Sequence, residues 1–121
     1  MRVGLDISAV GRWEKILCDR PDLLTRVFTE EEIAHADKKG MGKAASYAGL
    51  WAAREAAGKA LGTGFSGASW KDAFVSFDEG GAPHLHLSGL FQERAESLGI
   101  HDMALSISHE TEWAAAVVIM T

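Results

Sequence analysis

The chain has 121 residues, of which 47% are hydrophobic and 24% charged, a size and balance typical of one globular domain. Its formal net charge of -5 argues against nucleic acid as a partner. A single cysteine, Cys18, excludes an internal disulfide, and no apolar run approaches the roughly 20 residues that span a bilayer, so we expect a soluble cytoplasmic protein without a membrane partner.

The first part of the chain is predicted to form one strand and two short helices. Apolar residues alternate with small or polar ones over 3–7, which is the period of a strand. A helix is expected over 9–19, and Pro21 ends it. The capping-box pattern that begins at Thr29 starts a second short helix, which runs to about residue 37.

A basic, glycine-containing loop precedes the longest predicted helix, 45–61, which ends at the glycines of 62–64. The remaining elements are strands at 73–77 and 84–87, a helix at 90–98, and a hairpin of strands at 104–108 and 113–120. Strands joined by hairpins indicate an α+β fold with a largely antiparallel sheet and one long packed helix, in a single domain over 1–121.

The long helix has two different faces. Within WAAREAAGKALG, alanines form one stripe, against which another element can pack closely. Trp51, Glu55 and Lys59 form a second stripe at intervals of four residues. A Glu–Lys pair at this spacing is usually a solvated ion pair worth about 0.3–0.5 kcal/mol. However, the large ring of Trp51 is costly to leave on a solvated face.

Asp6 interrupts a strand that is otherwise apolar or glycine. It lies at the end of a sheet, or bonds to a turn, or is a ligand. If the long helix packs across this strand, Asp6 and Glu55 can converge, and two carboxylates repel unless a cation lies between them. Such hard oxygen ligands suit Mg²⁺, which takes its remaining ligands from water and phosphate. Lys59, one turn further on, would then face the same phosphate.

Three segments resemble the holo-acyl-carrier-protein synthases, the small stand-alone class of 4′-phosphopantetheinyl transferases. They are GLDIS at 4–8, WAAREAAGKALGTG at 51–64 and LSISHETEWAAAVVI at 105–119, and the likeness covers nearly the whole chain. It implies the α+β fold of that family and a homotrimer with active sites at subunit boundaries. It also implies that 4′-phosphopantetheine passes from coenzyme A to a serine of an apo acyl carrier protein in fatty acid biosynthesis, with release of adenosine 3′,5′-bisphosphate.

The resemblance also implies roles for individual residues. Asp6 and Glu55 would bind Mg²⁺, Glu55 and Lys59 would be catalytic, and Glu55, or a water that it polarises, is the candidate base for the serine proton. Residues implied to contact coenzyme A are Lys43, Arg54, Lys59, Gly64, Pro83, Ser108 and His109. On sequence alone, Lys43 can equally be a solvated loop residue with Lys38 and Lys39, and His109 can equally cap a turn.

Three positions depart from the family pattern. Arg54 stands where the family usually has lysine, and a planar guanidinium does not replace a point charge in the same way. Leu50 stands where many relatives have arginine, and Ala82 replaces a basic residue before the turn proline, Pro83. The nucleotide contacts are therefore expected to differ from the family pattern.

Acyl carrier proteins are acidic, so the basic residues near the first helix are candidates for the carrier contact. Arg12 and Arg26 would attract the carrier, and Trp13 and Leu23 would supply an apolar anchor. Alternatively, Trp13 belongs to the core and the helix face is merely solvated.

Two other functions remain open on the sequence. One is a small Mg²⁺-dependent phosphohydrolase or nucleotide-binding domain that uses the same carboxylates. The other is a non-catalytic oligomerising module in which Trp51 and the alanines serve packing alone. His84 and His86 share one strand face without an evident third ligand, so we predict that they are polar residues facing solvent.

Overall fold

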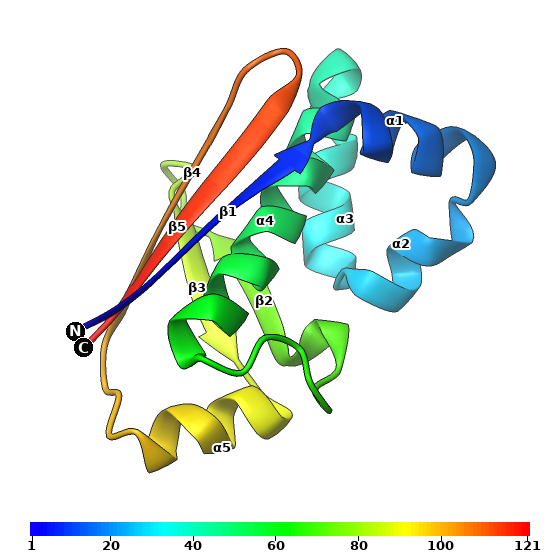
Figure 1. Cartoon of the computed structure of the whole chain (residues 1–121). Coiled ribbons are helices and arrows are strands. Elements are labelled where there is room, and N and C mark those ends of the chain that lie inside the picture. The colour runs from blue at the N-terminus through cyan, green and yellow to red at the C-terminus, as the bar shows by residue number, and fades with distance from the viewer.

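The computed structural model describes all 121 residues. Figure 1 shows an α+β arrangement in which strands and helices alternate in blocks along the chain, as the sequence predicts. The elements are β1 Arg2–Ala9, α1 Val10–Asp19, α2 Asp22–Val27, α3 Glu30–Asp37, α4 Lys43–Leu61, β2 Ala73–Phe77, β3 Pro83–Leu87, α5 Gly89–Ser97, β4 Met103–His109 and β5 Trp113–Met120, with short 3-10 turns η1 at Gly40–Gly42 and η2 at Trp70–Asp72. Every predicted element is present, and α2 is the one helix that the sequence analysis missed.

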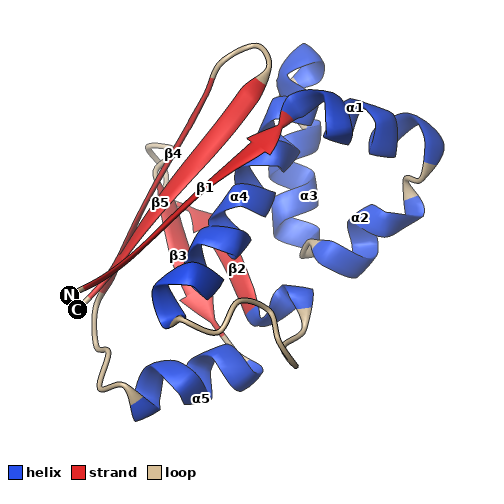
Figure 2. Cartoon of the chain, in the orientation of Figure 1, coloured by secondary structure: helices blue, strands red, loops and turns tan.

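The strands form two sheets, and all their pairings are antiparallel (Figure 2). In the larger sheet β5 lies between β1 and β4, so the two ends of the chain are neighbours in space. The smaller sheet is the hairpin β2–β3. The expected antiparallel pairing is therefore confirmed, although the strands are divided between two sheets.

Helix α4 packs across β1 and β5, and its alanine stripe makes this close approach possible. Ala52, Ala53, Ala56 and Ala57 are completely buried. On the strand side the small residue is Gly4, where an added Cβ would stand 1.8 Å from the carbonyl oxygen of Ala56. The close packing predicted from the alanines is thus confirmed.

Helices α1 and α3 pack on the other side of α4, beside an aromatic cluster. Trp13 is only 2% exposed, and its ring centroid lies 5.3 Å from Phe28 and 5.7 Å from Trp51. Its indole nitrogen donates to the hydroxyl of Ser8 at 3.2 Å. The expectation that Trp13 contacts a carrier protein is therefore wrong, because its ring is part of the core.

The outer face of the larger sheet is apolar and uncovered. Val3, Leu5 and Ile7 of β1 are 63%, 58% and 60% exposed, and Trp113 of β5 is 55% exposed. A continuous apolar surface of this kind usually marks an interface. None of the helices has both the length and the apolar character that crossing a bilayer requires.

Candidate functional site

Strand β1 and helix α4 bring the three predicted site residues together. The even-numbered residues of β1 face α4, so the carboxylate of Asp6 points to the helix while its odd-numbered neighbours point away. The ammonium of Lys59 donates to an Asp6 carboxylate oxygen at 3.1 Å and to the carbonyl of Leu5 at 2.9 Å. Glu55 precedes Lys59 by one helical turn on the same face of α4.

The negative charge of Asp6 affects the ionisation of the Glu55 carboxyl. Burial, and next the charge of Asp6, raise the pKa of the Glu55 carboxyl, while Lys59 and Arg12 act in the opposite direction. A carboxylate whose ionisation is disfavoured by a neighbouring carboxylate forms with it a donor set in which a cation is stabilising. Because no cluster of three or more potential metal-binding side chains exists in the chain, a metal here would take its other ligands from water and phosphate.

Trp51, one turn before Glu55, is held between two elements. The guanidinium of Arg12 in α1 lies 5.5 Å from the centroid of the Trp51 ring, and the ring of Trp70 packs on it at 4.9 Å. These contacts explain why so large a ring is tolerated on the Glu55 face of the helix. Arg12, predicted only as a carrier contact, also lies close enough to Glu55 to affect its ionisation. No pattern in the sequence predicted that Trp70 packs on Trp51 or that Arg12 lies near Glu55.

A second part of the candidate site is a cavity of about 320 Å³ on another side of α4. Its lining residues come from α3, the loop after it, α4, β2, β3 and β4. They are His35, Lys39, Gly42, Ala45, Ser46, Leu50, Phe77, Gly81, Pro83, Ile107 and His109. The structure therefore brings together Pro83 and His109, two of the residues that the resemblance assigned to coenzyme A.

His35 lies in one wall of this cavity and was not among the residues predicted from the sequence. The ring of His35 stacks on Phe77 with centroids 3.5 Å apart, and Lys39 lies one helical turn beyond His35. Burial, followed by the charges of Lys39 and Lys38, lowers the pKa of His35, which favours its neutral ring. The sequence did offer one signal for this wall, because His35 and Lys39 are four residues apart and such a spacing puts two side chains on one side of a helical segment.

Arg54 requires a correction. It was expected to contact coenzyme A, but it is completely buried and its guanidinium pairs with the carboxylate of Glu32 in α3. A group with no exposed surface and with partners inside the protein cannot contact a ligand in this arrangement. Its burial follows from its place beside the alanine stripe of α4.

The other predicted residues lie at the margins of the site. Lys43 pairs with Asp37 at 3.2 Å, and Gly64 follows the end of α4 and packs against Gly58. Ser108 is exposed beside Trp113 on the outer face of the larger sheet. Near α1, Arg12 and Arg26 are exposed and Leu23 is half-buried. His84 and His86 face solvent, as predicted, with hydrogen bonds to Asp78 and Ser76.

A carboxylate pair on a strand and a helix, with a lysine beside it, is an arrangement suited to phosphoryl transfer. Residues 2–118 match the family model described as the 4′-phosphopantetheinyl transferase superfamily. The chain belongs to this superfamily and is an enzyme, as the sequence resemblance predicted.

The chain is also similar over nearly its whole length to individual holo-[acyl-carrier-protein] synthases. A holo-[acyl-carrier-protein] synthase of Treponema denticola is 44% identical over 118 residues, which cover 98% of this chain and 95% of that protein. One of Thermoanaerobacter sp. (strain X514) is 42% identical over 117 residues, 97% of this chain and 84% of that protein.

Solved structures agree on the fold. The crystal structure of Helicobacter pylori holo-[acyl-carrier-protein] synthase in complex with coenzyme A is 31% identical and superposes with a TM-score of 0.83, covering 98% of this chain and 99% of that chain. The Bacillus anthracis synthase, in complex with CoA (3′,5′-ADP), is 36% identical with a TM-score of 0.78, covering 98% of this chain and 94% of that chain.

Proposed function

We propose that this protein transfers 4′-phosphopantetheine from coenzyme A to a serine of an apo acyl carrier protein and releases adenosine 3′,5′-bisphosphate. The observation that carries the proposal is the meeting of Asp6, Glu55 and Lys59 at the junction of β1 and α4. Family membership supports it, as do the coenzyme A complexes of similar synthases.

Asp6 and Glu55 would hold Mg²⁺, since both are carboxylates and the charge of Asp6 disfavours the ionisation of Glu55 without a cation. When bound, the ion would neutralise negative charge on the pyrophosphate of coenzyme A. Lys59 would leave Asp6 and donate to an oxygen of the same pyrophosphate. Glu55, or a metal-bound water that it polarises, remains our candidate base for the serine proton.

Two features support assembly of the site from more than one copy of the chain. At 3.6 residues per turn, Ser46, which lines the cavity, and Glu55 point to roughly opposite sides of α4. A single ligand therefore cannot contact both the cavity and the carboxylates of the same copy of the chain. The uncovered apolar face of β1 and β5 provides a surface for association, and we propose a homotrimer.

The carrier protein would dock beside α1. Arg12 and Arg26 are exposed there and supply positive charge for an acidic partner, while Leu23 supplies apolar surface. Arg20 contributes less, because it forms an ion pair with Asp22 at 2.9 Å. The transferred group would thus reach the carrier at the edge of the site marked by Arg12 and Glu55.

The test is a carrier-modification assay with coenzyme A, an apo acyl carrier protein and Mg²⁺, read by mass spectrometry. We expect a mass gain of one phosphopantetheine on the carrier and none when the metal is chelated. Hydrolysed coenzyme A with an unmodified carrier would instead support a phosphohydrolase. A folded protein that neither modifies the carrier nor hydrolyses coenzyme A would support a non-catalytic module. Glu55→Gln is expected to abolish the Mg²⁺-dependent transfer while the protein stays folded. Glu93→Gln, which changes an exposed carboxylate on α5, is its matched control and should keep the activity.

A further inference from the structure

A fully buried ion pair lies directly beside the candidate site. Glu32 of α3 and Arg54 of α4 are both completely buried, and the Nη1 atom of Arg54 donates to Glu32 Oε2 at 2.7 Å. Arg54 immediately precedes Glu55 in the chain. Neither Glu32 nor Arg54 can touch a ligand, so the proposed reaction leaves both of these charges without a role.

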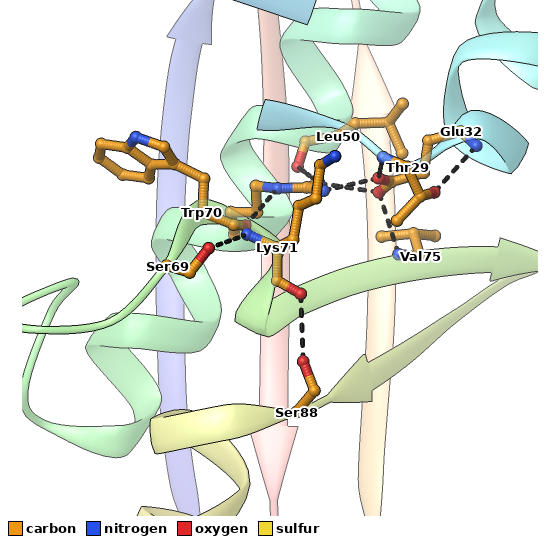
Figure 3. A network of polar contacts seen from close by, with 9 residues as sticks. Thr29, Glu32, Leu50, Ser69, Trp70, Lys71, Val75 and Ser88 are labelled. Atoms are coloured by element: carbon orange, nitrogen blue, oxygen red, sulfur yellow. Dashed lines mark hydrogen bonds and ion pairs between the residues drawn. The ribbon is translucent and has the colours of Figure 1, made fainter. Parts of the chain in front are cut away.

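The pair is the centre of a network that joins four parts of the chain (Figure 3). Glu32 also accepts the backbone N–H groups of Thr29 at 2.8 Å and Val75 at 3.0 Å. Arg54 also donates from Nε to the backbone oxygen of Trp70 at 2.9 Å. Through these bonds the start of α3, the hairpin strand β2 and the turn η2 are all attached to one residue of α4.

Stability alone is a poor explanation for this pair. The cost of removing two charges from water offsets most of their attraction, and apolar replacements of similar size are often equally stable. What a buried bidentate pair adds is direction, because a guanidinium and a carboxylate must meet in one plane. The pair therefore restricts how α4 can rotate, more than how tightly it packs.

The rest of the α4 interface needs such a restriction. Many of its contacts with β1 and β5 are made by small alanine side chains, which offer few ridges to fix rotation about the helix axis, and the bonds from Arg2 to the backbone oxygens of Ala60 and Leu61 hold only its C-terminal end. A rotation of one residue, about 100°, would turn Glu55 away from Asp6. Arg54 is a large polar side chain that anchors the buried side of the helix directly beside Glu55.

We infer that Glu32 and Arg54 are positioning residues that fix the rotation of α4 so that Glu55 faces Asp6. The inference rests on the proposed function for its effect on catalysis. The same network acts on a second residue of the site, since the ring of Trp70 packs against Trp51, one turn before Glu55. Loss of the pair loosens both the Glu55 carboxylate and the Trp51 ring.

The decisive variant combines Glu32→Gln with Arg54→Met. It removes both charges together, and the glutamine carbonyl can still accept the N–H of Val75. Folding is checked by circular dichroism and thermal unfolding. Affinity for Mn²⁺, used as the probe ion, is measured by electron paramagnetic resonance. We expect Mn²⁺ affinity to fall at least about fivefold and the kcat of carrier modification at least about tenfold, because small displacements of reacting groups are costly.

Two single variants complete the test. Glu31→Gln changes an exposed neighbour of Glu32 on the same helix, and it is expected to match the wild type. Arg54→Lys keeps the charge inside the network but loses the planar bidentate contact, so its Mn²⁺ affinity is expected to lie between those of the wild type and the double variant. A folded double variant with Mn²⁺ affinity and kcat within twofold of the wild type overturns the inference. Because metal affinity is read directly, failure of the wild type to modify a carrier would refute the proposed function alone.

Discussion

The ammonium of Lys59 and the carboxylate of Asp6 form an ion pair of 3.1 Å across the junction of α4 and β1. The Asp6 side chain is only 16% exposed, and the backbone oxygen of Leu5 also holds the ammonium. Lys59 is thus the counter-ion of Asp6 in this structure. A divalent ion that binds Asp6 would compete with Lys59 unless a phosphate draws the lysine away.

Lys59→Met tests this competition. Without coenzyme A, the affinity for Mg²⁺ should rise about 1.4- to fivefold, because an ion pair whose lysine is half exposed is worth about 0.2–1 kcal/mol. The affinity for coenzyme A should fall about tenfold, since the proposed pyrophosphate contact is lost. Both affinities can be measured by isothermal titration calorimetry. Weaker binding of Mg²⁺ by this variant would contradict the competition.

Asp6→Asn should lower the kcat of carrier modification by at least about 10²-fold, because one of the two proposed protein ligands for Mg²⁺ is lost. Chelation of the metal should abolish the wild-type reaction in the same assay. Mass spectrometry of the carrier gives both rates. If Asp6→Asn retains wild-type activity, Asp6 is not part of the site.

Glu55→Gln should stabilise the metal-free protein at neutral pH. Burial and the charge of Asp6 raise the pKa of Glu55, so the folded protein binds this proton more tightly than the unfolded chain does. That contribution to stability is fully present below the ordinary pKa of glutamate, about 4.3, and is lost as the pH rises through the folded pKa.

Glutamine cannot ionise, so the variant avoids this loss. Its unfolding temperature in the presence of a chelator should exceed that of the wild type at pH 7, and the difference should shrink as the pH is lowered to 4. Thermal scans at several pH values provide the measurement. A lower unfolding temperature than the wild type at pH 7 would show that Glu55 is not strained by its surroundings.

Leu5→Asp should separate the proposed trimer into monomers, because it places a charge in the centre of the uncovered apolar face of β1. Light scattering at working concentration measures the change. Leu90→Asp is the matched control, since Leu90 is 49% exposed on α5 and lies outside this face. A wild type that is monomeric and fully active would refute the trimer itself.

Gly4→Ala should destabilise the protein by about 1–3 kcal/mol or more, the usual cost of forcing atoms into a packed core. The added Cβ would meet the backbone of α4 at Ala56, which cannot turn aside as a side chain would. Gly11→Ala, in α1, has no atom within 4 Å of the new Cβ and should stabilise by about 0.4–1 kcal/mol. Chemical unfolding gives both values, and equal effects would contradict the close approach of β1 and α4.

The alternation over 3–7 and the turn residues were sufficient for the strands, because side-chain period and turn chemistry are local properties. The segment 22–27 was missed as a helix, since it is only one to two turns long and its neighbours hold it in place. The convergence of Asp6 and Glu55 was proposed from the sequence only on the condition that the long helix crosses the first strand. The structure meets that condition through Gly4 and the alanines.

The sequence by itself determined the order of the elements, the alanine face of α4, and the spacing of Trp51, Glu55 and Lys59, all of which depend on residues near one another in the chain. Only the tertiary structure decided that Arg54 is buried against Glu32, that Trp13 belongs to the core, and that His35 lines the cavity with Pro83 and His109. Those facts depend on which distant surfaces exclude water from each other, and a charged or aromatic residue has the same local pattern whether it is buried or exposed.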